Sequence, residues 1–498
     1  MRWPRLEVRA VTKNKITTFL FENKVVVLFV FLCIGGTIAS GQSMNFVVSE
    51  LFTRIARNSF LVLALIIPVL AGLGLNFGIV IGAMAAQIAI FFTTHWGFTG
   101  VSGFLLTALL STPLAVFFGY LVGKLFNNMK GAEMIGGLVL GYFTDGLYQL
   151  FFLFILGGVI PIDNPKLMIS TGVGVKNTID LKDTIKYSLD TVPMLTIIEF
   201  GFYIAVAVTV ISAVVKLAKK QEINWKRTAV SLVGLVVVYA LTFIPAVERF
   251  LSSDRLRLLN AVELACFGTL IWQAVKFALC KMRKTDWPRN RAIAACIAAA
   301  LLYALTYVPA IYNVLVYVQL PVLTYLCIAA LCFFNTALMK TRLGQNMRTV
   351  GQSRVVANAA GINVDRTRII AMIFSTVLAS WGQLIFLQNV GTFSTYGAHT
   401  QVGQFAIASL VVGGASVQKA TNKQAIIGVI LFHTLFIVAP LAGKELFGNA
   451  MIGEYFRVFV SYGVIAMSLA MHAWKKVVKP RLEANAAAGA SPAGEAAQ

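Results

Sequence analysis

The amino-acid sequence predicts an all-α, polytopic membrane protein with about 10–14 transmembrane or re-entrant helices. Of its 498 residues, 58% are hydrophobic and only 12% are charged, which is about half the charged share of an ordinary soluble protein. Uncharged stretches such as 60–94 and 96–123 are each long enough to cross the hydrocarbon core as a helix. A helix satisfies its own backbone hydrogen bonds inside lipid. The short alternating segments of a membrane β-barrel do not occur in the sequence.

Apolar segments follow one another along almost the whole sequence. A basic leader of 24 residues precedes the first, and the small residues at 39–41 resemble a signal-peptide cleavage site. Because the leader is long and many apolar segments follow, we expect an uncleaved first span. The segments lie near 25–41, 60–73, 76–92, 101–122, 134–160, 193–217, 228–246, 260–280, 291–309, 318–339, 367–388, 400–414, 424–441 and 455–474.

The basic residues indicate how the spans are oriented. The formal net charge is +22, from 42 Lys and Arg against 20 Asp and Glu. Basic residues collect on the cytoplasmic loops of membrane proteins, and a cytoplasmic N-terminus places most of them inside. We therefore expect both termini in the cytoplasm. No basic domain with interleaved aromatic residues stands outside the spans, which argues against nucleic-acid binding.

Residues that carry enzymatic or metal chemistry are not grouped in this sequence. The six cysteines lie in or beside apolar segments, and the four histidines are scattered without metal-ligand spacing. We expect no catalytic site, no metal and no cofactor bound by this chain; a membrane enzyme would need clustered His, Asp, Glu or Cys. The phosphate-binding pattern G-x-x-x-x-G-K-[ST] is also missing from the sequence, so any ATP would be hydrolysed by a separate polypeptide.

A few ionisable residues lie inside apolar segments, where such residues are costly and usually functional. Asp145 and Glu199 make an ion-coupled secondary transporter the main alternative to an ATP-driven one. Glu263 and Lys276 lie in another segment. A local helix break at Asp145 and a local partner for Glu199 would explain these two acids without ion coupling.

Two apolar regions are interrupted in a comparable way, one near each end of the chain. The first breaks at 71–78 and the second at 413–416. Glycine and asparagine let a helix stop and leave backbone dipoles free inside the protein, and paired broken segments indicate a transport pathway. Close helix packing through small residues explains the pattern equally well. The candidate pathway residues are Asn76, Gly78, Gly82, Gly413 and Gly414.

A basic segment at 341–364 follows an apolar segment on the expected inner side. It is expected to form two short helices with a break at Gly351. Its alanines and glycines have little bulk, so another protein's backbone can approach closely, and Arg348 and Arg354 can pair with acidic groups on that partner. An ordinary basic loop, kept inside by its charge, is the alternative.

The same segment resembles the cytoplasmic coupling loop of the bacterial permease family that serves ribose-type sugars, nucleosides and branched-chain amino acids. That loop reads approximately G-x-x-x-R-A-V-G-x-x-x-x-A-A-x-x-A-G-I-N-V. Thr349 and Val356 depart from it, and further likenesses lie at 75–83 and 406–416. The matching positions are, in order, Gly344, Arg348, Val350, Gly351, Ala357, Ala360, Gly361, Ile362, Asn363 and Val364.

The resemblance implies a type II ABC-importer-like permease, a transport subunit that moves a small polar solute across the bacterial cytoplasmic (inner) membrane by alternating access. ATP and Mg²⁺ would then be bound by a partner ABC ATPase that docks on the loop. The other implied partners are a second permease copy or a sister permease, an extracytoplasmic solute-binding protein and membrane lipid. The form of 75–78 favours nucleosides or branched-chain amino acids and that of 413–416 favours sugars, so the solute stays open.

The resemblance also implies which residues couple the permease to its ATPase. We expect a bulky residue at Gly351 or Ala360 to stop transport while folding and membrane insertion stay intact. The implied coupling residues are Gly344, Arg348, Gly351, Ala357, Ala360 and Gly361.

The same comparison divides the chain into regions, because the likeness covers 60–160 and 318–474 and leaves an apparent insertion between them. An extra helical hairpin is expected at 228–280 within that insertion. The regions are a cytoplasmic N-terminal segment (1–24), a first transmembrane half with a broken helix near 71–78 (25–160), an extracytoplasmic loop (161–192), an inserted transmembrane region (193–310), a second transmembrane half containing the coupling loop 340–366 (311–474), and a disordered cytoplasmic tail (475–498).

Overall fold

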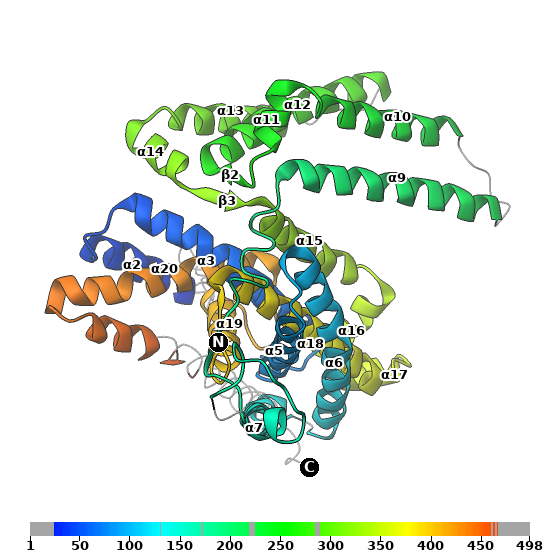
Figure 1. The fold of residues 1–498 in the computed structure, drawn as a ribbon. Helices are drawn as coiled ribbons and strands as arrows, with labels where there is room; N and C mark the ends of the chain where they lie inside the picture. The colour runs from blue at the N-terminus through cyan, green and yellow to red at the C-terminus, as the bar shows by residue number, and fades with distance from the viewer. Residues whose placement is uncertain are drawn as a thin grey trace, which may run out of the picture.

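The computed structural model describes residues 24–129, 131–170, 173–218, 225–283, 289–459, 462–463 and 466. Helices dominate this part of the chain, and its four strands have three residues each (Figure 1). The predicted N-terminal segment, apart from Lys24, and the predicted tail lie outside the described residues. Most of the last predicted apolar segment, 455–474, does so as well.

Seven of the described helices are long and apolar enough to cross a membrane, and nine are counted if each of two bent helix pairs is one span. Shorter apolar helices account for further predicted segments, among them α2 (Lys24–Ala39) and α5 (Ile79–His95). The prediction of an all-α, polytopic membrane protein is thus confirmed. The seven spans are Met44–Leu70, Gly100–Asn128, Glu133–Gly158, Met194–Val215, Leu258–Ala278, Val364–Val390 and Asn422–Phe447.

Helix α18 (Val364–Val390) forms the centre of the core and packs against three other helices. These are α3 (Met44–Ala64), which continues as α4 (Ile66–Leu70), together with α5 and α6 (Gly100–Asn128). Glycines let the helix backbones meet: a Cβ built on Gly119 of α6 would lie 2.8 Å from the Cα of Ile373. Packing of this kind through small residues is characteristic of membrane helices.

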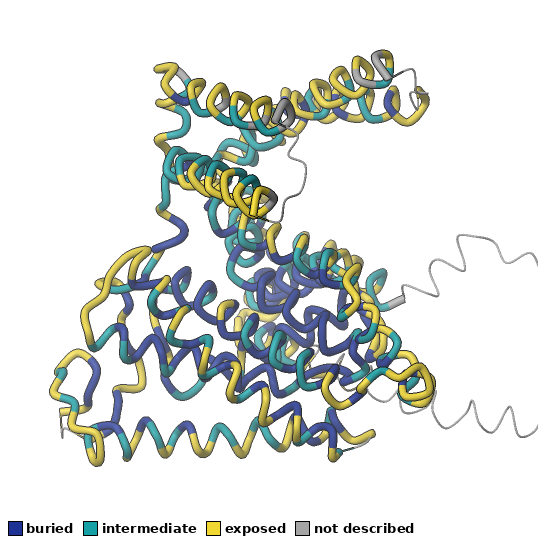
Figure 2. The backbone as a smooth tube through the Cα atoms, turned by 90° about the vertical axis from the view of Figure 1, so that its right-hand side faces the viewer, coloured by how far each residue is buried: buried dark blue, intermediate teal, exposed yellow. Residues whose placement is uncertain are grey.

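Two more helices complete the buried body of the molecule. They are α19 (Ala398–Val412) and α20 (Asn422–Phe447), and α20 packs against α2, α3 and α19. The buried residues concentrate in this body, while the layer formed by 194–321 is mostly exposed (Figure 2). Helix α7 (Glu133–Leu150), which continues through a π-helical turn (Phe151–Ile155) into α8 (Leu156–Gly158), is also largely exposed.

The loop between α8 and the next helix is held against the body. Its strand β1 (Thr178–Asp180) pairs antiparallel with β4 (Thr392–Ser394), which follows α18, with Ile179 opposite Phe393. Near the end of the loop the buried Asp190 accepts hydrogen bonds from Thr324 (2.6 Å), Gln388 (3.0 Å) and Asn389 (2.7 Å).

The described residues of 194–321 (194–218, 225–283 and 289–321) form two copies of one helical unit, placed together as a layer beside the body (Figure 1). The first copy comprises α9 (Met194–Ala218), α10 (Trp225–Leu241), α11 (Pro245–Leu251) and β2 (Arg255–Arg257). The second comprises α12 (Leu258–Arg283), α13 (Arg289–Leu305), α14 (Pro309–Tyr317) and β3 (Gln319–Pro321). Each element of the second copy begins 64 residues after its counterpart.

Local contacts repeat with the same offset. Tyr-Ala-Leu-Thr occurs at 239–242 and again at 303–306, and both threonine hydroxyls donate to the tyrosine carbonyl oxygen at 2.6 Å. Strands β2 and β3 pair antiparallel about Leu256 and Leu320, as expected for two copies related by a local two-fold axis. Self-similarity at a fixed period identifies an internal repeat.

The duplication changes how the insertion is divided into hairpins. The sequence interpretation placed one extra hairpin at 228–280, whereas the structure pairs α9 with α10 and α12 with α13. Hydropathy locates apolar helices but does not say which neighbours pack together. Each copy closes on itself: the backbone N–H of Met194 donates to the carbonyl oxygen of Ser253 (3.1 Å), and that of Leu258 to Val318 (2.9 Å).

Candidate functional site

The coupling segment, residues 340–366, joins α15 (Val322–Leu338) to α18 through two short helices, α16 (Arg342–Gln352) and α17 (Arg354–Ala359). The sequence interpretation expected the break between them at Gly351. The break instead lies at Ser353, whose hydroxyl accepts a hydrogen bond from the backbone N–H of Val356 (3.3 Å) and caps α17.

The six proposed coupling residues differ in how far they are buried. Ala357 and Gly344 are buried, and a Cβ on Gly344 would lie 2.1 Å from the carbonyl oxygen of Leu338. Gly351 is half-buried. Arg348, Ala360 and Gly361 are exposed.

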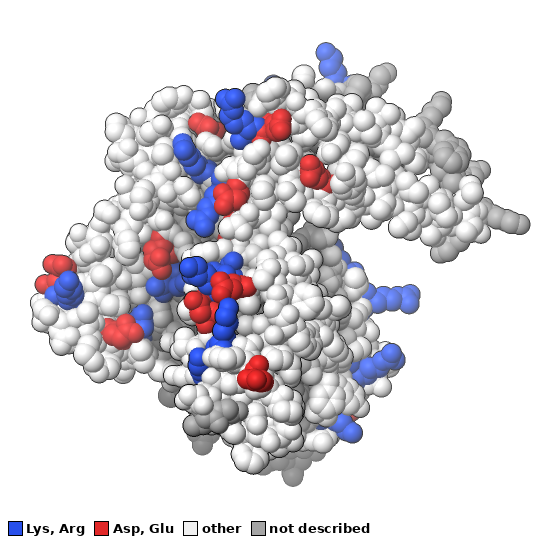
Figure 3. All heavy atoms as spheres, in the orientation of Figure 1, with Lys and Arg blue, Asp and Glu red and all other residues white. Residues whose placement is uncertain are grey.

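Two apolar side chains of α17, next in sequence to the coupling residue Ala357, are strongly exposed. Val355 is 79% exposed and Val356 is 58% exposed. We call residues 355–360 of this surface the α17 tip; only Ala357 within it is buried. Basic side chains occur along the edge of the molecule where α16 and α17 lie (Figure 3). Large uncharged areas of the same face surround them.

Gly351 lies against the first helix break. A Cβ on Gly351 would lie 2.1 Å from the carbonyl oxygen of Leu70, and one on Gly72 would lie 2.8 Å from the Cα of Gly351. Gly72 has φ of +74°, a conformation that favours glycine. A bulky residue at Gly351 therefore strikes the chain's own backbone. Ala360, which is exposed, is the cleaner position for the variant that we expect to stop transport without affecting folding.

A polar cavity of about 270 Å³ lies where the coupling segment meets both helix breaks. Gly72 to Gly74 come from the first break, and Val417 and Gln418 come from the loop that contains the second. The remaining wall comes from the start of α7 and from the α16–α17 corner. The lining residues are Gly72, Leu73, Gly74, Gly131, Glu133, Met134, Val350, Gly351, Gln352, Ser353, Arg354, Val417 and Gln418.

One carboxylate at this cavity holds two arginines. Oε1 of Glu133, in the first turn of α7, accepts hydrogen bonds from Arg354 of α17 and from Arg368 of α18, the latter at 2.6 Å. Arg368 is 1% exposed and also donates to the carbonyl oxygen of Phe126 (3.4 Å). The sequence interpretation paired Arg354 with a partner protein, but its guanidinium is bound to Glu133 of the same chain.

The predicted pathway residues of the first half lie between helices rather than along the cavity. Asn76 is buried, and its amide donates to the hydroxyl of Ser375 in α18 (3.2 Å). A Cβ on Gly78 would lie 3.0 Å from Oδ1 of Asn76. One on Gly82 would lie 2.5 Å from the carbonyl oxygen of Thr376, so α5 and α18 cross closely at this glycine.

The two pathway glycines of the second half lie where α19 and α20 meet. A Cβ on Gly413 would lie 1.9 Å from the carbonyl oxygen of Gln424. Gly414 has φ of +85°, and its carbonyl oxygen accepts a hydrogen bond from Nε2 of Gln424 (2.8 Å). Close helix packing, the alternative that the sequence left open, accounts for the geometry at Gly413.

An ionisable pair joins α7 to α19 inside the body. Nε2 of His399 lies 2.7 Å from Oδ1 of Asp145, and His399 is fully buried. Sequence reasoning singled out Asp145 but not His399, which is 254 residues away and has no local signal. Glu199 lies in α9, whose main contacts are with α10, α11 and α15, so the two acids of the ion-coupled alternative belong to different parts of the fold.

Comparison with known proteins gives one partial likeness. The chain is 32% identical over 123 residues to a probable ABC transporter permease protein, y4mJ, of Sinorhizobium fredii. That alignment covers 24% of this chain and 35% of the relative, so the chain spans about a third of the length of the relative it matches. The likeness supports an ABC transporter permease in general. No family model matches the sequence, and no solved structure matches it either.

Proposed function

We propose that this chain is the permease subunit of an ABC importer in the bacterial inner membrane. It moves a small polar solute, a sugar, a nucleoside or a branched-chain amino acid, by alternating access. The observation that carries the proposal is the contact between the coupling segment and the first helix break at Gly351 and Gly72. In this proposal the coupling segment receives force from the ATPase, and the contact passes that force directly to the helix that is interrupted at 71–78.

Three connections transmit movement of the α17 tip in this proposal. Gly351 bears on Leu70 and Gly72, Arg354 is bound through Glu133 to α7, and Arg368 ties the same carboxylate to α18. Closure of nucleotide-binding domains would push the tip, and these contacts would rock α7 and α18 together. Rocking of packed helices against each other is an established way to alternate access.

The proposal requires partners that this chain lacks. A separate ABC ATPase binds ATP and Mg²⁺ and docks on the α17 tip, with the exposed Arg348 as an anchor. A second permease copy or a sister permease completes the pathway, and an extracytoplasmic solute-binding protein delivers the solute to the opposite face. This chain then acts as a transport subunit, with hydrolysis carried out by its partner.

Placing acidic groups at the α17 tip will disconnect the ATPase without unfolding the permease. In the variant Val355→Asp/Val356→Asp, ATP-driven uptake and co-purification of the ATPase should both be lost, because two desolvated apolar contacts become charged. The thermal unfolding midpoint of the isolated permease should stay unchanged, since both side chains are exposed.

The matched control is Val355→Thr/Val356→Thr, which keeps the size and neutrality of both side chains. It should retain most of the uptake. Wild-type uptake by the aspartate variant, measured in proteoliposomes with the ATPase present, would rule out docking at this tip.

The Asp145–His399 pair favours a second candidate function, proton-coupled transport. Ionisable residues inside membrane spans are a common feature of proton relays; here His399 is buried and the Asp145 side chain is 22% exposed. One uptake experiment distinguishes the two candidate functions. Uptake by the proposed importer stops when ATP is depleted and continues when the proton gradient is collapsed. Uptake that follows the gradient and is lost in Asp145→Asn would instead assign the function to the pair.

A further inference from the structure

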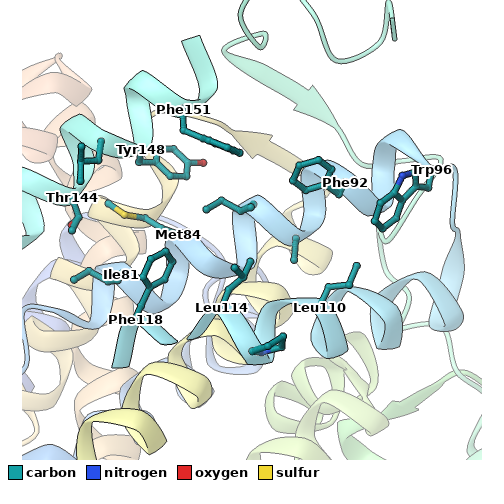
Figure 4. A pocket seen from close by; sticks show the side chains of 14 residues that line it. Ile81, Met84, Phe92, Trp96, Leu110, Leu114, Phe118, Thr144, Tyr148 and Phe151 are labelled. Atoms are coloured by element: carbon teal, nitrogen blue, oxygen red, sulfur yellow. The ribbon is translucent and has the colours of Figure 1, made fainter. Parts of the chain in front are cut away.

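An apolar groove of about 640 Å³ runs along one face of α5, between α6 and α7 (Figure 4). Its floor comes from α5, whose lining residues recur at helical spacing from Ile81 to Phe92, and from Trp96, which follows the end of the helix. One wall comes from α6 around Pro113, and the other from α7 and the π-helical turn. The lining residues are Ile81, Met84, Ile88, Ala89, Phe92, Trp96, Leu110, Pro113, Leu114, Phe118, Thr144, Leu147, Tyr148 and Phe151.

The groove wall exposes almost no polar surface. The hydroxyl of Thr144 already donates to its own helix, with carbonyl oxygens of Leu140 and Gly141 at 2.8 and 3.1 Å. Tyr148 is 4% exposed and its ring lies against His399; its hydroxyl, which has no hydrogen-bond partner among the described residues, is buried. A sugar, a nucleoside or a zwitterion would lose its hydration here without replacement, so the groove excludes polar solutes and accepts hydrocarbon.

The dimensions of the groove match a single hydrocarbon chain. A rise of about 1.5 Å per residue puts Ile81 and Trp96 about 22 Å apart along α5, so the mean cross-section is about 30 Å². A helix with side chains is about 10 Å across, so a helix of a second copy could enter the open groove with only part of its width.

The groove is continuous with the surface that faces the bilayer. Leu109 and Phe117 on α6 and Phe143 on α7 are exposed apolar side chains on the two helices that form its walls. Trp96 lies at one end, beside the polar loop, where the N–H of Gly100 donates to the carbonyl oxygen of Thr184 (2.7 Å). Tryptophan is enriched at the membrane–water interface, so this end lies near the lipid headgroups.

We propose that the groove is a lipid site that holds one phospholipid acyl chain, with its headgroup near Trp96. The acyl chain fills the space between α7 and the α5–α6 hairpin. Because α7 also carries Glu133, which binds Arg354 of the coupling segment, the acyl chain supports the helix to which movement of the α17 tip is passed in the proposed function. The site itself does not depend on the proposed transport function.

Native mass spectrometry of the full chain tests the site. The protein is stripped of lipid in detergent, incubated with phosphatidylglycerol and transferred to the gas phase. The wild type should retain one phospholipid per chain. Leu114→Trp fills the groove from α6, and displacing even two methylenes should lower retention roughly tenfold. Leu147→Trp tests the opposite wall, where the side chain is exposed enough to tolerate the change.

Leu109→Trp is the matched control, because Leu109 is on the same helix but 69% exposed outside the groove. It should retain lipid like the wild type. Equal retention by all four proteins, or none by the wild type, would overturn the proposal. A lipid-free wild-type dimer that Leu114→Trp converts to monomer would show instead that a second copy covers the groove.

Discussion

Replacing Glu133 with alanine will be among the most destabilising single changes in the coupling region. The buried guanidinium of Arg368 loses its counter-charge, and Arg354 loses its attachment to α7. Removing one partner of a buried ion pair costs about 3–5 kcal/mol, because the remaining charge stays buried and uncompensated. The free energy of unfolding, measured by denaturant titration in detergent micelles, should fall by an amount in this range.

An exposed ion pair provides the comparison for this result. Lys166 and Asp183 are paired at 3.2 Å with about three quarters of each side chain exposed, so Asp183→Ala should have no measurable effect. The double variant Glu133→Ala/Arg368→Met removes both buried charges and should regain part of the lost stability. If Glu133→Ala is as stable as Asp183→Ala, the ion pairs of Glu133 with Arg354 and Arg368 do not hold the coupling segment to the body.

Replacing Gly351 with valine will abolish transport and also weaken the fold. The new side chain meets the carbonyl group of Leu70 and the backbone of Gly72, neither of which can move as a flexible side chain does. Overpacking of this kind costs about 1–3 kcal/mol. Uptake in proteoliposomes and the thermal unfolding midpoint should fall together, whereas changes at the α17 tip affect uptake alone.

Gly146→Ala is the control for the loss of a helical glycine. Gly146 lies in α7, and nothing lies within 4 Å of a Cβ built there. Alanine should leave the midpoint unchanged or raise it slightly, since it restricts the unfolded chain. A fully active Gly351→Val protein would mean that the contact with the first break does not transmit movement.

The helical membrane fold could be predicted because it depends on local composition. Runs without charge mark α6, α18 and α20, which largely coincide with predicted apolar segments. Most of α3 was not predicted, because Glu50, Arg54 and Arg57 interrupt it and the predicted segment 60–73 covers only its end. The break in the coupling segment was assigned to Gly351 because glycine interrupts helices, but Ser353 provides the cap and lies two residues later. Glycine is a general helix breaker, whereas the position of this break depends on which side chain caps α17, and that is Ser353.

The contacts that form the site could not be predicted in the same way. Glu133 and Arg354 are 221 residues apart, and nothing near either residue indicates the other. The segment's small residues matched a family pattern, but that pattern does not say which of them are buried: Gly344 and Ala357 pack inside, while Ala360 is exposed. Burial depends on the tertiary packing of α16 and α17 against the body.

The repeat in residues 194–321 is present in the sequence, although hydropathy does not reveal it. Tyr-Ala-Leu-Thr at 239–242 and 303–306 lies in the sequence itself, yet hydropathy records only that both stretches are apolar. An alignment of the sequence with itself places the two motifs opposite each other, so the duplication is visible in the amino-acid sequence alone.

The repeat also has a consequence for how the protein can change. The start and the end of each copy lie next to each other. The backbone N–H of Met194 donates to the carbonyl oxygen of Ser253, and that of Leu258 donates to the carbonyl oxygen of Val318. A copy therefore adds an even number of membrane passages. Gain or loss of a whole copy leaves the sidedness of α15 and everything after it unchanged, whereas loss of one helix alone would invert the second half. Such a unit can be multiplied or deleted without disturbing the charge bias that orients the rest of the chain.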